Sequence, residues 1–131
     1  MSNARKSPVG NGYRTGYLRS VQWFRRRDHW FAEQEARTRE LRCVVCRNAA
    51  TRRQLELHHL DYSPVTRIGD RWIAGEAHED LCAMHPACHD EVHRVLDTDP
   101  VLRSHRTRPI ATVHAIRIAR TRLPQTEGIR A

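Results

Sequence analysis

The sequence lacks the features of a membrane protein or of a small secreted protein. No run of about 18 apolar residues occurs, so we expect no segment to span a membrane. Residues 1–12 contain no apolar stretch of the signal-peptide kind. The chain has only four cysteines, too few and too clustered for a secreted disulfide framework. We therefore expect a reduced, cytoplasmic setting.

The chain is also poor in lysine, and its charge is unevenly distributed. It contains 23 basic and 15 acidic residues, with a net charge of +8 and a pI near 10.3, and one basic residue is a lysine. Residues 1–42 carry ten basic and four acidic side chains and residues 98–131 carry seven and two, whereas residues 43–97 carry six and nine. Basic flanks of this kind favour a polyanionic partner, of which nucleic acid is the most common.

No internal repeat or low-complexity tract is present, and the length suits one small domain. We expect a flexible basic arm over residues 1–19, a folded domain over residues 20–97 and a basic C-terminal extension over residues 98–131. The domain begins with an amphipathic helix over residues 20–42, N-capped by Ser20. The inner face of this helix is predicted to carry Trp23, Phe24, Trp30, Phe31 and Leu41.

Shorter elements are predicted after this helix. Residues 55–60 predict a strand, residues 61–70 a loop and residues 71–74 a short second strand. Residues 86–96 predict a helix whose first turn tolerates the proline at its start. Residues 109–123 predict another helix, with apolar positions that are only partly at helical spacing.

Histidine and cysteine residues form the most informative pattern in the sequence, at spacings typical of metal sites. The pattern comprises Cys43, Cys46, His58, His59, Cys88, His89 and His93. His89 and His93 are four residues apart, so on a helix their rings project from one face and can bind one ion. His58 and His59 point to opposite faces of a strand, so they must have different roles, one as a metal ligand and the other as a base.

These residues resemble the HNH endonuclease family, whose core is a strand-loop-strand-helix unit around one metal ion, often supported by a zinc knuckle. The resemblance covers residues 17–97 and rests on Cys43-Val44-Val45-Cys46, Leu57-His58-His59-Leu60-Asp61-Tyr62, Asp80-Leu81 and His85-Pro86-Ala87-Cys88-His89-Asp90-Glu91-Val92-His93. It implies an α+β fold in which residues 20–97 form an HNH nuclease domain. That domain would contain a small ββα-metal (His-Me finger) core and a zinc-binding knuckle, preceded by the amphipathic helix and flanked by basic arms.

The resemblance also implies a role for each histidine. His59 would be the general base, and His58, His89 and His93 would bind the catalytic ion. Asp80 occupies the position of the family's asparagine, which holds the base in place. An Asp80 carboxylate could accept a hydrogen bond from the base and would tend to raise its pKa. Magnesium is favoured by oxygen-rich sites, whereas three imidazoles suit zinc, nickel, cobalt or manganese, so more than one divalent metal could serve.

The knuckle has two alternative ligand sets. The family register places Cys43, Cys46, His85 and Cys88 around a structural zinc ion, with His85 where the family usually has a cysteine. Cys82 could replace His85 and form a four-thiolate site. Soft thiolates prefer zinc, and closure by four protein ligands is typical of a structural site. We favour His85 and keep Cys82 as the alternative.

The function implied by the resemblance is hydrolysis of DNA phosphodiester bonds by a single-metal mechanism. Arg25, Arg26 and Arg27, on the outer face of the first helix, are candidate contacts to phosphate. RNA is an alternative substrate, and double-strand cleavage would need two active sites, as in a homodimer. Two other classes fit the same residues: a zinc-stabilised module that binds nucleic acid without cutting it, and a zinc-organised module that binds a protein partner.

Overall fold

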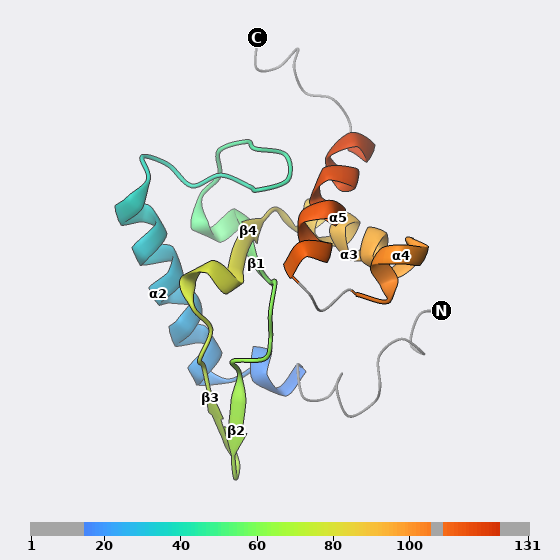
Figure 1. Ribbon diagram of the computed structural model, residues 1–131. Coiled ribbons are helices and arrows are strands. Elements are labelled where there is room, and N and C mark those ends of the chain that lie inside the picture. Colours follow the sequence, from blue (N-terminus) through green and yellow to red (C-terminus); the bar gives the residue numbers. More distant parts are fainter. Residues whose placement is uncertain (1–14, 106–108, 124–131) are drawn as a thin grey trace.

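The computed structural model describes residues 15–105 and 109–123 and has an α+β fold (Figure 1). Its elements are α2 (Val21–Arg37), η2 (Arg52–Gln54), β1 (Glu56–His59), β2 (Thr66–Ile68), β3 (Arg71–Ile73), η3 (His78–Asp80), β4 (Leu81–Met84), α3 (Pro86–Thr98), α4 (Pro100–Arg103) and α5 (Pro109–Arg122). The strands form two separate antiparallel pairs. None of the helices in the described ranges is long and apolar enough to cross a membrane. Residues 1–14 of the predicted arm, and residues 106–108 and 124–131 of the predicted extension, lie outside the described residues.

α2 is the predicted amphipathic helix, and Ser20 caps it as expected. The Ser20 hydroxyl accepts a hydrogen bond from the backbone N–H of Trp23 at 3.1 Å. The helix ends at Arg37, earlier than predicted. Thr38 ends it because its backbone is extended and its hydroxyl donates to the Gln34 carbonyl, at 3.0 Å.

The buried face of α2 is narrower than predicted. Trp23, Trp30 and Phe31 are buried, whereas Phe24 is 52% exposed. Adjacent residues on a helix diverge by about 100°, so Phe24 points away from the face that Trp23 buries. Leu41 is buried as predicted, although it lies beyond the end of the helix.

Residues 15–18 form a helical turn where the sequence predicted part of a flexible arm. Tyr17 is fully buried in this turn, and its hydroxyl donates to both carboxylate oxygens of Glu76, at 2.9 and 2.8 Å. Its ring packs against Trp23 and Trp72, each with a centroid distance of 5.6 Å. These contacts attach the start of the described chain to the core.

β1 corresponds to the predicted strand, but its partner is β4. The antiparallel register places Leu57 opposite Ala83 and His59 opposite Leu81. The sequence predicted a second strand at residues 71–74, which is confirmed as β3, but this strand lies in the other sheet. Residues 81–84 show neither alternation nor β-branched side chains, so their pairing comes from burial against β1 and not from a local preference.

β2 and β3 form a hairpin inside the region predicted to be a loop and a single strand. Its two-residue turn consists of Gly69 and Asp70, and Gly69 has a φ of 59°. A positive φ at the first turn residue is typical of tight two-residue hairpins, and glycine adopts it without strain. The hairpin projects from the rest of the chain (Figure 1).

α5 confirms the predicted helix over residues 109–123 and packs against α3. Ala111, Ala115 and Ala119 are buried at successive helical turns, together with Thr112. Small residues at every fourth position let two helices approach closely. This part of the predicted C-terminal extension therefore belongs to the same folded core as α3.

The β1–β4 sheet lies between α2 on one side and α3 with α5 on the other (Figure 1). His59 faces α2, with its ring centroid 4.8 Å from that of Trp23. His58 faces α5, where its Nε2 lies 3.2 Å from the Thr112 hydroxyl. The two faces of this short sheet thus contain separate groups of polar side chains.

Because Ala115 is fully buried on α5, which packs against α3, we expect Ala115→Leu to overpack the core around α5. The expected loss is about 1–3 kcal/mol in the free energy of unfolding, measured by chemical denaturation with tryptophan fluorescence. The matched control is Ala32→Leu on the exposed side of α2, which should change stability by less than about 0.5 kcal/mol. Equal stability of the two variants would contradict the close packing of α5 on α3.

Candidate metal centres

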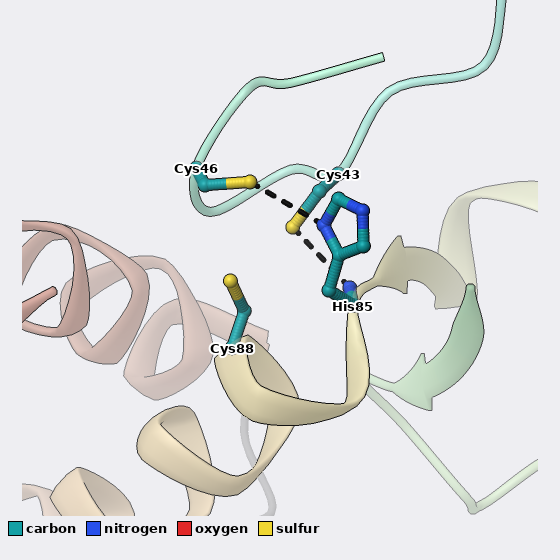
Figure 2. Close-up of side chains that lie close together, drawn as sticks. All are labelled: Cys43, Cys46, His85 and Cys88. Carbon is teal, nitrogen blue, oxygen red and sulfur yellow. Dashed lines mark hydrogen bonds between the residues drawn. The ribbon is translucent and has the colours of Figure 1, made fainter. Parts of the chain in front are cut away.

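Three cysteines and one histidine come together where the loop after α2 meets the start of α3 (Figure 2). Cys43 and Cys46 come from the loop, His85 is the N-cap residue of α3, and Cys88 lies in its first turn. One ligand atom from each residue can be chosen so that all four lie within 4.8 Å of one another. The cluster could hold a metal ion such as zinc, since three thiolates and an imidazole are a common zinc ligand set.

The contacts within this cluster fit a tetrahedral ion. Cys46 Sγ lies 3.4 Å from His85 Nδ1, close to the roughly 3.5 Å that separates sulfur and nitrogen ligands of a tetrahedral zinc ion. The His85 backbone N–H donates to Cys43 Sγ at 3.4 Å. Burial alone would raise the pKa of the Cys43 thiol, but the backbone N–H groups of Cys46, His85 and Val45 together lower it. A lowered pKa favours the thiolate, which is the form that binds metal.

Cys82 lies outside this group, so the structure brings together the ligand set with His85. Burial, with a smaller effect of Cys43, raises the pKa of the Cys82 thiol to about 12. Cys82 therefore remains a neutral thiol. On β4, Cys82 pairs in register with His58. The next residue of that strand, Ala83, contacts the loop that carries Cys43 and Cys46, because its carbonyl accepts a hydrogen bond from the Val44 N–H.

Arg120 of α5 donates hydrogen bonds to the knuckle loop, the segment from Cys43 to Cys46. Its Nε donates to the Val45 carbonyl and its NH2 group to the Val44 carbonyl, each at 2.8 Å. Both carbonyls lie between the two loop cysteines, so this guanidinium fixes the loop that presents them. The sequence analysis did not identify Arg120, because 74 positions separate it from Cys46 and no local pattern links them.

His58, His89 and His93 form a second cluster on the α3 side of the sheet. His58 Nδ1 lies 3.2 Å from His89 Nε2, and His93 Nε2 lies 3.1 Å from the same atom. Nitrogen ligands of one tetrahedral ion at about 2.05 Å would be roughly 3.3 Å apart, so the three imidazoles fit a single ion. The helical spacing of His89 and His93 and the strand position of His58 produce this convergence, as predicted.

Two further side chains orient these imidazoles. His89 Nδ1 lies 2.8 Å from a carboxylate oxygen of Glu56, at the start of β1, and His58 Nε2 lies 3.2 Å from the Thr112 hydroxyl. A ring nitrogen that donates a proton to such a partner leaves the other nitrogen of the ring available to a metal ion. Neither Glu56 nor Thr112 was recognised in the sequence. Glu56 could have been identified from the sequence, because it lies two positions before His58 and so on the same face of the predicted strand. No sequence pattern links Thr112 to these histidines.

His59 is enclosed on the opposite side of β1. Its side chain is 1% exposed, its ring stacks on Tyr62 with centroids 4.0 Å apart, and its Nε2 lies 2.6 Å from a Glu76 carboxylate oxygen. Burial works to raise the pKa of the Glu76 carboxyl, but hydrogen bonds with His59, with its own backbone N–H and with Tyr17 outweigh it, so this pKa is lowered. Burial and the bond to Glu76 raise the pKa of Tyr17 well above its ordinary value, so Tyr17 stays a donor.

The Asp80 carboxylate is not the hydrogen-bond partner of His59, contrary to the expectation from its place in the sequence. Its carboxylate accepts a hydrogen bond from the Ala77 N–H at 2.8 Å, and its carbonyl accepts one from the Leu60 N–H at 2.8 Å. Asp80 therefore closes the η3 turn and extends the β1–β4 pairing. The carboxylate that holds His59 belongs to Glu76, which no motif distinguishes.

The three arginines predicted to contact phosphate have different environments. Arg25 is exposed. Arg26 turns toward the protein, and its Nε donates to the Glu76 carbonyl at 3.0 Å. The Arg27 guanidinium lies over the Phe31 ring, 5.0 Å from its centroid. Arg25 is thus the only one of the three on a fully exposed position.

Comparisons with protein-family models, with curated proteins and with solved structures found no match.

We expect Cys88→Ser to lose one equivalent of bound zinc and to lower the thermal midpoint. The reason is that a structural zinc ion contributes on the order of 10 kcal/mol of apparent binding free energy. Zinc content is measured by elemental analysis, and cobalt substitution reports thiolate ligands by their charge-transfer absorption. Cys82→Ser is the matched control and should keep both the zinc and the absorption. Loss of zinc in Cys82→Ser, with retention in His85→Gln, would instead place Cys82 in the site.

The lowered pKa of Glu76 predicts a specific pH dependence of stability. The unfolded chain, with a carboxyl pKa near 4.5, binds the proton more readily than the folded protein does, so the stabilisation is complete above that pH. It is lost as the pH falls through the lower, folded-state pKa. Glu76→Gln should be less stable than the wild type by about 1–3 kcal/mol at pH 7, and this difference should shrink below pH 4.5.

The measurement is denaturant unfolding between pH 3.5 and pH 7, with the wild type and the variants at the same zinc concentration. Glu79→Gln, which removes an exposed carboxylate three residues away, should follow the wild-type curve. A constant difference between the wild type and Glu76→Gln at every pH would show that the Glu76 carboxylate is not preferentially ionised in the folded state.

Proposed function

We propose that this protein is a metal-dependent phosphodiesterase of the HNH endonuclease type that cleaves DNA. The observation that carries the proposal is the convergence of His58, His89 and His93, with nitrogen atoms 3.1 and 3.2 Å apart, in a cluster that shares no residue with the cysteine-rich one. A structural zinc site takes four protein ligands, whereas a catalytic site keeps a position open for water or substrate. Three histidines from the protein leave such a position.

The surrounding elements support a ββα-metal core. β1 supplies His58, β4 pairs with β1, and α3, which supplies His89 and His93, follows β4 after a single residue. In this proposed unit residues 81–84 would be the second strand, and the sequence analysis did not predict that strand. The knuckle then joins the loop after α2 to the first turn of α3, and it fixes the end of the helix from which both metal-binding histidines project.

A divalent ion held by these histidines would polarise a phosphoryl oxygen and stabilise the departing alkoxide. His59 is the proposed general base. In this proposal its Nε2–H donates to the Glu76 carboxylate, 2.6 Å away, and Nδ1 is the proton acceptor. Glu76 is a positioning residue in this proposal, because it fixes the tautomer and the orientation of His59 without contacting the substrate.

Access to His59 requires a local movement. With 1% of its side chain exposed, the ring cannot meet water or a phosphodiester while Tyr62 covers it. Tyr62 lies just beyond the end of β1, in a segment without helix or strand, so its stack can open without unpairing the β1–β4 sheet. The proposed reaction therefore includes displacement of Tyr62 when the substrate binds.

The burial of His59 also favours a second candidate function, a zinc-stabilised module that binds nucleic acid without cutting it. In that case the His59–Glu76–Tyr17 hydrogen bonds serve the core alone, and the three-histidine cluster is a second structural metal site. The two functions differ in one measurable respect, since only the first predicts strand cleavage that depends on added metal and on His59.

The test is nicking of supercoiled plasmid by purified protein with magnesium, manganese, nickel or zinc added separately. We expect His59→Ala to lower the nicking rate by about 10²–10⁴, the usual effect of removing a general base, and His89→Ala to abolish metal-dependent nicking. The control is His105→Ala, which changes an exposed histidine beyond α4 and should nick like the wild type.

Because His59 is buried, each variant must first match the wild type in circular dichroism and zinc content. Glu76→Gln provides an independent test, since it keeps the shape of the side chain and weakens its hold on His59. Unchanged nicking by a folded His59→Ala protein would rule out His59 as the base, and salt-sensitive DNA binding without nicking under any metal would favour the binding module.

A further inference from the structure

A groove runs between the first half of α2 and the β2–β3 hairpin, with a volume of about 690 Å³. This α2–hairpin groove is defined here by Arg25, Arg26, Ile68, Arg71, Trp72 and Ile73. The hairpin that forms one wall projects from the rest of the chain (Figure 1). The volume lies within the range of about 300–1,000 Å³ that is typical of ligand sites.

Positive charge lies on both walls of the groove. Arg25 extends from α2 and Arg71 from β3, and both are exposed. Within residues 15–105 and 109–123, neither of them forms an ion pair with a carboxylate. Their guanidinium groups are therefore available to an anionic ligand, and the net charge of +8 attracts one from a distance.

The groove also exposes apolar surface on the hairpin. Ile68 is 69% exposed and Ile73 is 39% exposed, on the strands that flank the hairpin turn. Trp72, between them in the hairpin, turns inward, and the Arg67 guanidinium covers its ring at 4.9 Å from the centroid. Two isoleucines beside unpaired arginines provide apolar contact and phosphate contact within one surface.

We propose that the α2–hairpin groove binds a nucleic-acid strand, with Arg25 and Arg71 on successive phosphates and Ile68 and Ile73 against sugars and bases. A polynucleotide repeats an anionic phosphate and a flat apolar base in each unit, which matches the combination of groups in this groove. Some architectural DNA-binding proteins insert apolar side chains, isoleucine among them, between base steps. This inference rests on the proposed function in one respect, since it takes from that function the identity of the ligand as nucleic acid.

Contacts beneath the groove connect it to His59. Arg26, on the groove wall, donates to the Glu76 carbonyl at 3.0 Å, and the Glu76 carboxylate holds His59 at 2.6 Å. The Trp72 ring packs on Tyr17 at 5.6 Å, and the Tyr17 ring lies 6.1 Å from that of His59. A strand held in the groove would therefore lie over the same side of β1 as the proposed base.

The test is fluorescence anisotropy with labelled single-stranded and duplex oligonucleotides at several salt concentrations, using the full zinc-loaded chain without added catalytic metal. Arg25→Gln and Arg71→Gln should each weaken binding and reduce the slope of log affinity against log salt by about one. Ile68→Ser should weaken binding roughly fivefold and leave this slope unchanged, because it removes apolar contact alone. The controls are Arg103→Gln on α4 and Ile110→Ser on α5, both at exposed positions outside the groove, which should bind like the wild type.

These substitutions are at exposed positions, so the variants should retain the fold, as thermal midpoint and zinc content will verify. Equal weakening by the groove variants and by Arg103→Gln would overturn the groove as the binding surface. Absence of nucleic-acid binding at low salt would also overturn it and would favour an acidic protein partner.

The outcome is separable from that of the proposed function. Plasmid nicking by the wild type, with groove variants that bind normally, would retain the nuclease and reject the groove. Loss of binding in the groove variants of a protein that never nicks would retain the groove and reject the nuclease.

Discussion

The alternation of side chains between the two faces of β1 is the constraint on which the rest of this structure depends. Consecutive side chains of a strand leave on opposite faces, so His58 and His59 enter different surroundings although they are adjacent in the chain. His58 meets two other imidazoles and a hydroxyl, a set that suits a metal ion. His59 meets a carboxylate and three aromatic rings, which exclude water and fix one orientation. A shift of one residue in the register of β1 would exchange these surroundings and remove both groups.

The helices on the His58 side join the two clusters of candidate metal ligands. In the first turn of α3, Cys88 belongs to the cysteine-rich cluster and the next residue, His89, to the three-histidine cluster. α5 contacts both regions, with Thr112 near His58 and Arg120 on the knuckle loop two turns later. A metal ion in the knuckle would therefore restrict the helix that carries the histidines, since the two clusters share that turn. Close packing of α5 through its alanines maintains both of these contacts.

Features that depend on residues close in sequence were predicted correctly. The Ser20 cap, the strand containing His58 and His59, the helix starting at Pro86 and the helix over residues 109–123 follow from local preferences and short-range periodicity. The strand at residues 71–74 was also predicted, but β4, the partner of β1, was not, for the same reason. Residues 71–74 have strong strand preferences and a tight turn beside them, so they pair locally, whereas residues 81–84 pair with β1 through long-range burial that no short window contains.

The sequence alone determined which side chains could act as metal ligands, because ligand chemistry and the spacings of three, four and one residues are local properties. Only the tertiary structure decided which of these side chains come together and which residues hydrogen-bond to them. It selected His85 over Cys82 for the cysteine-rich cluster, and it placed Glu76, not Asp80, against His59. It also brought Thr112 and Arg120 from the C-terminal helix to sites formed by residues far earlier in the chain. Each of these contacts joins distant segments through the packing of whole elements, and packing of that kind leaves no periodic pattern in the sequence.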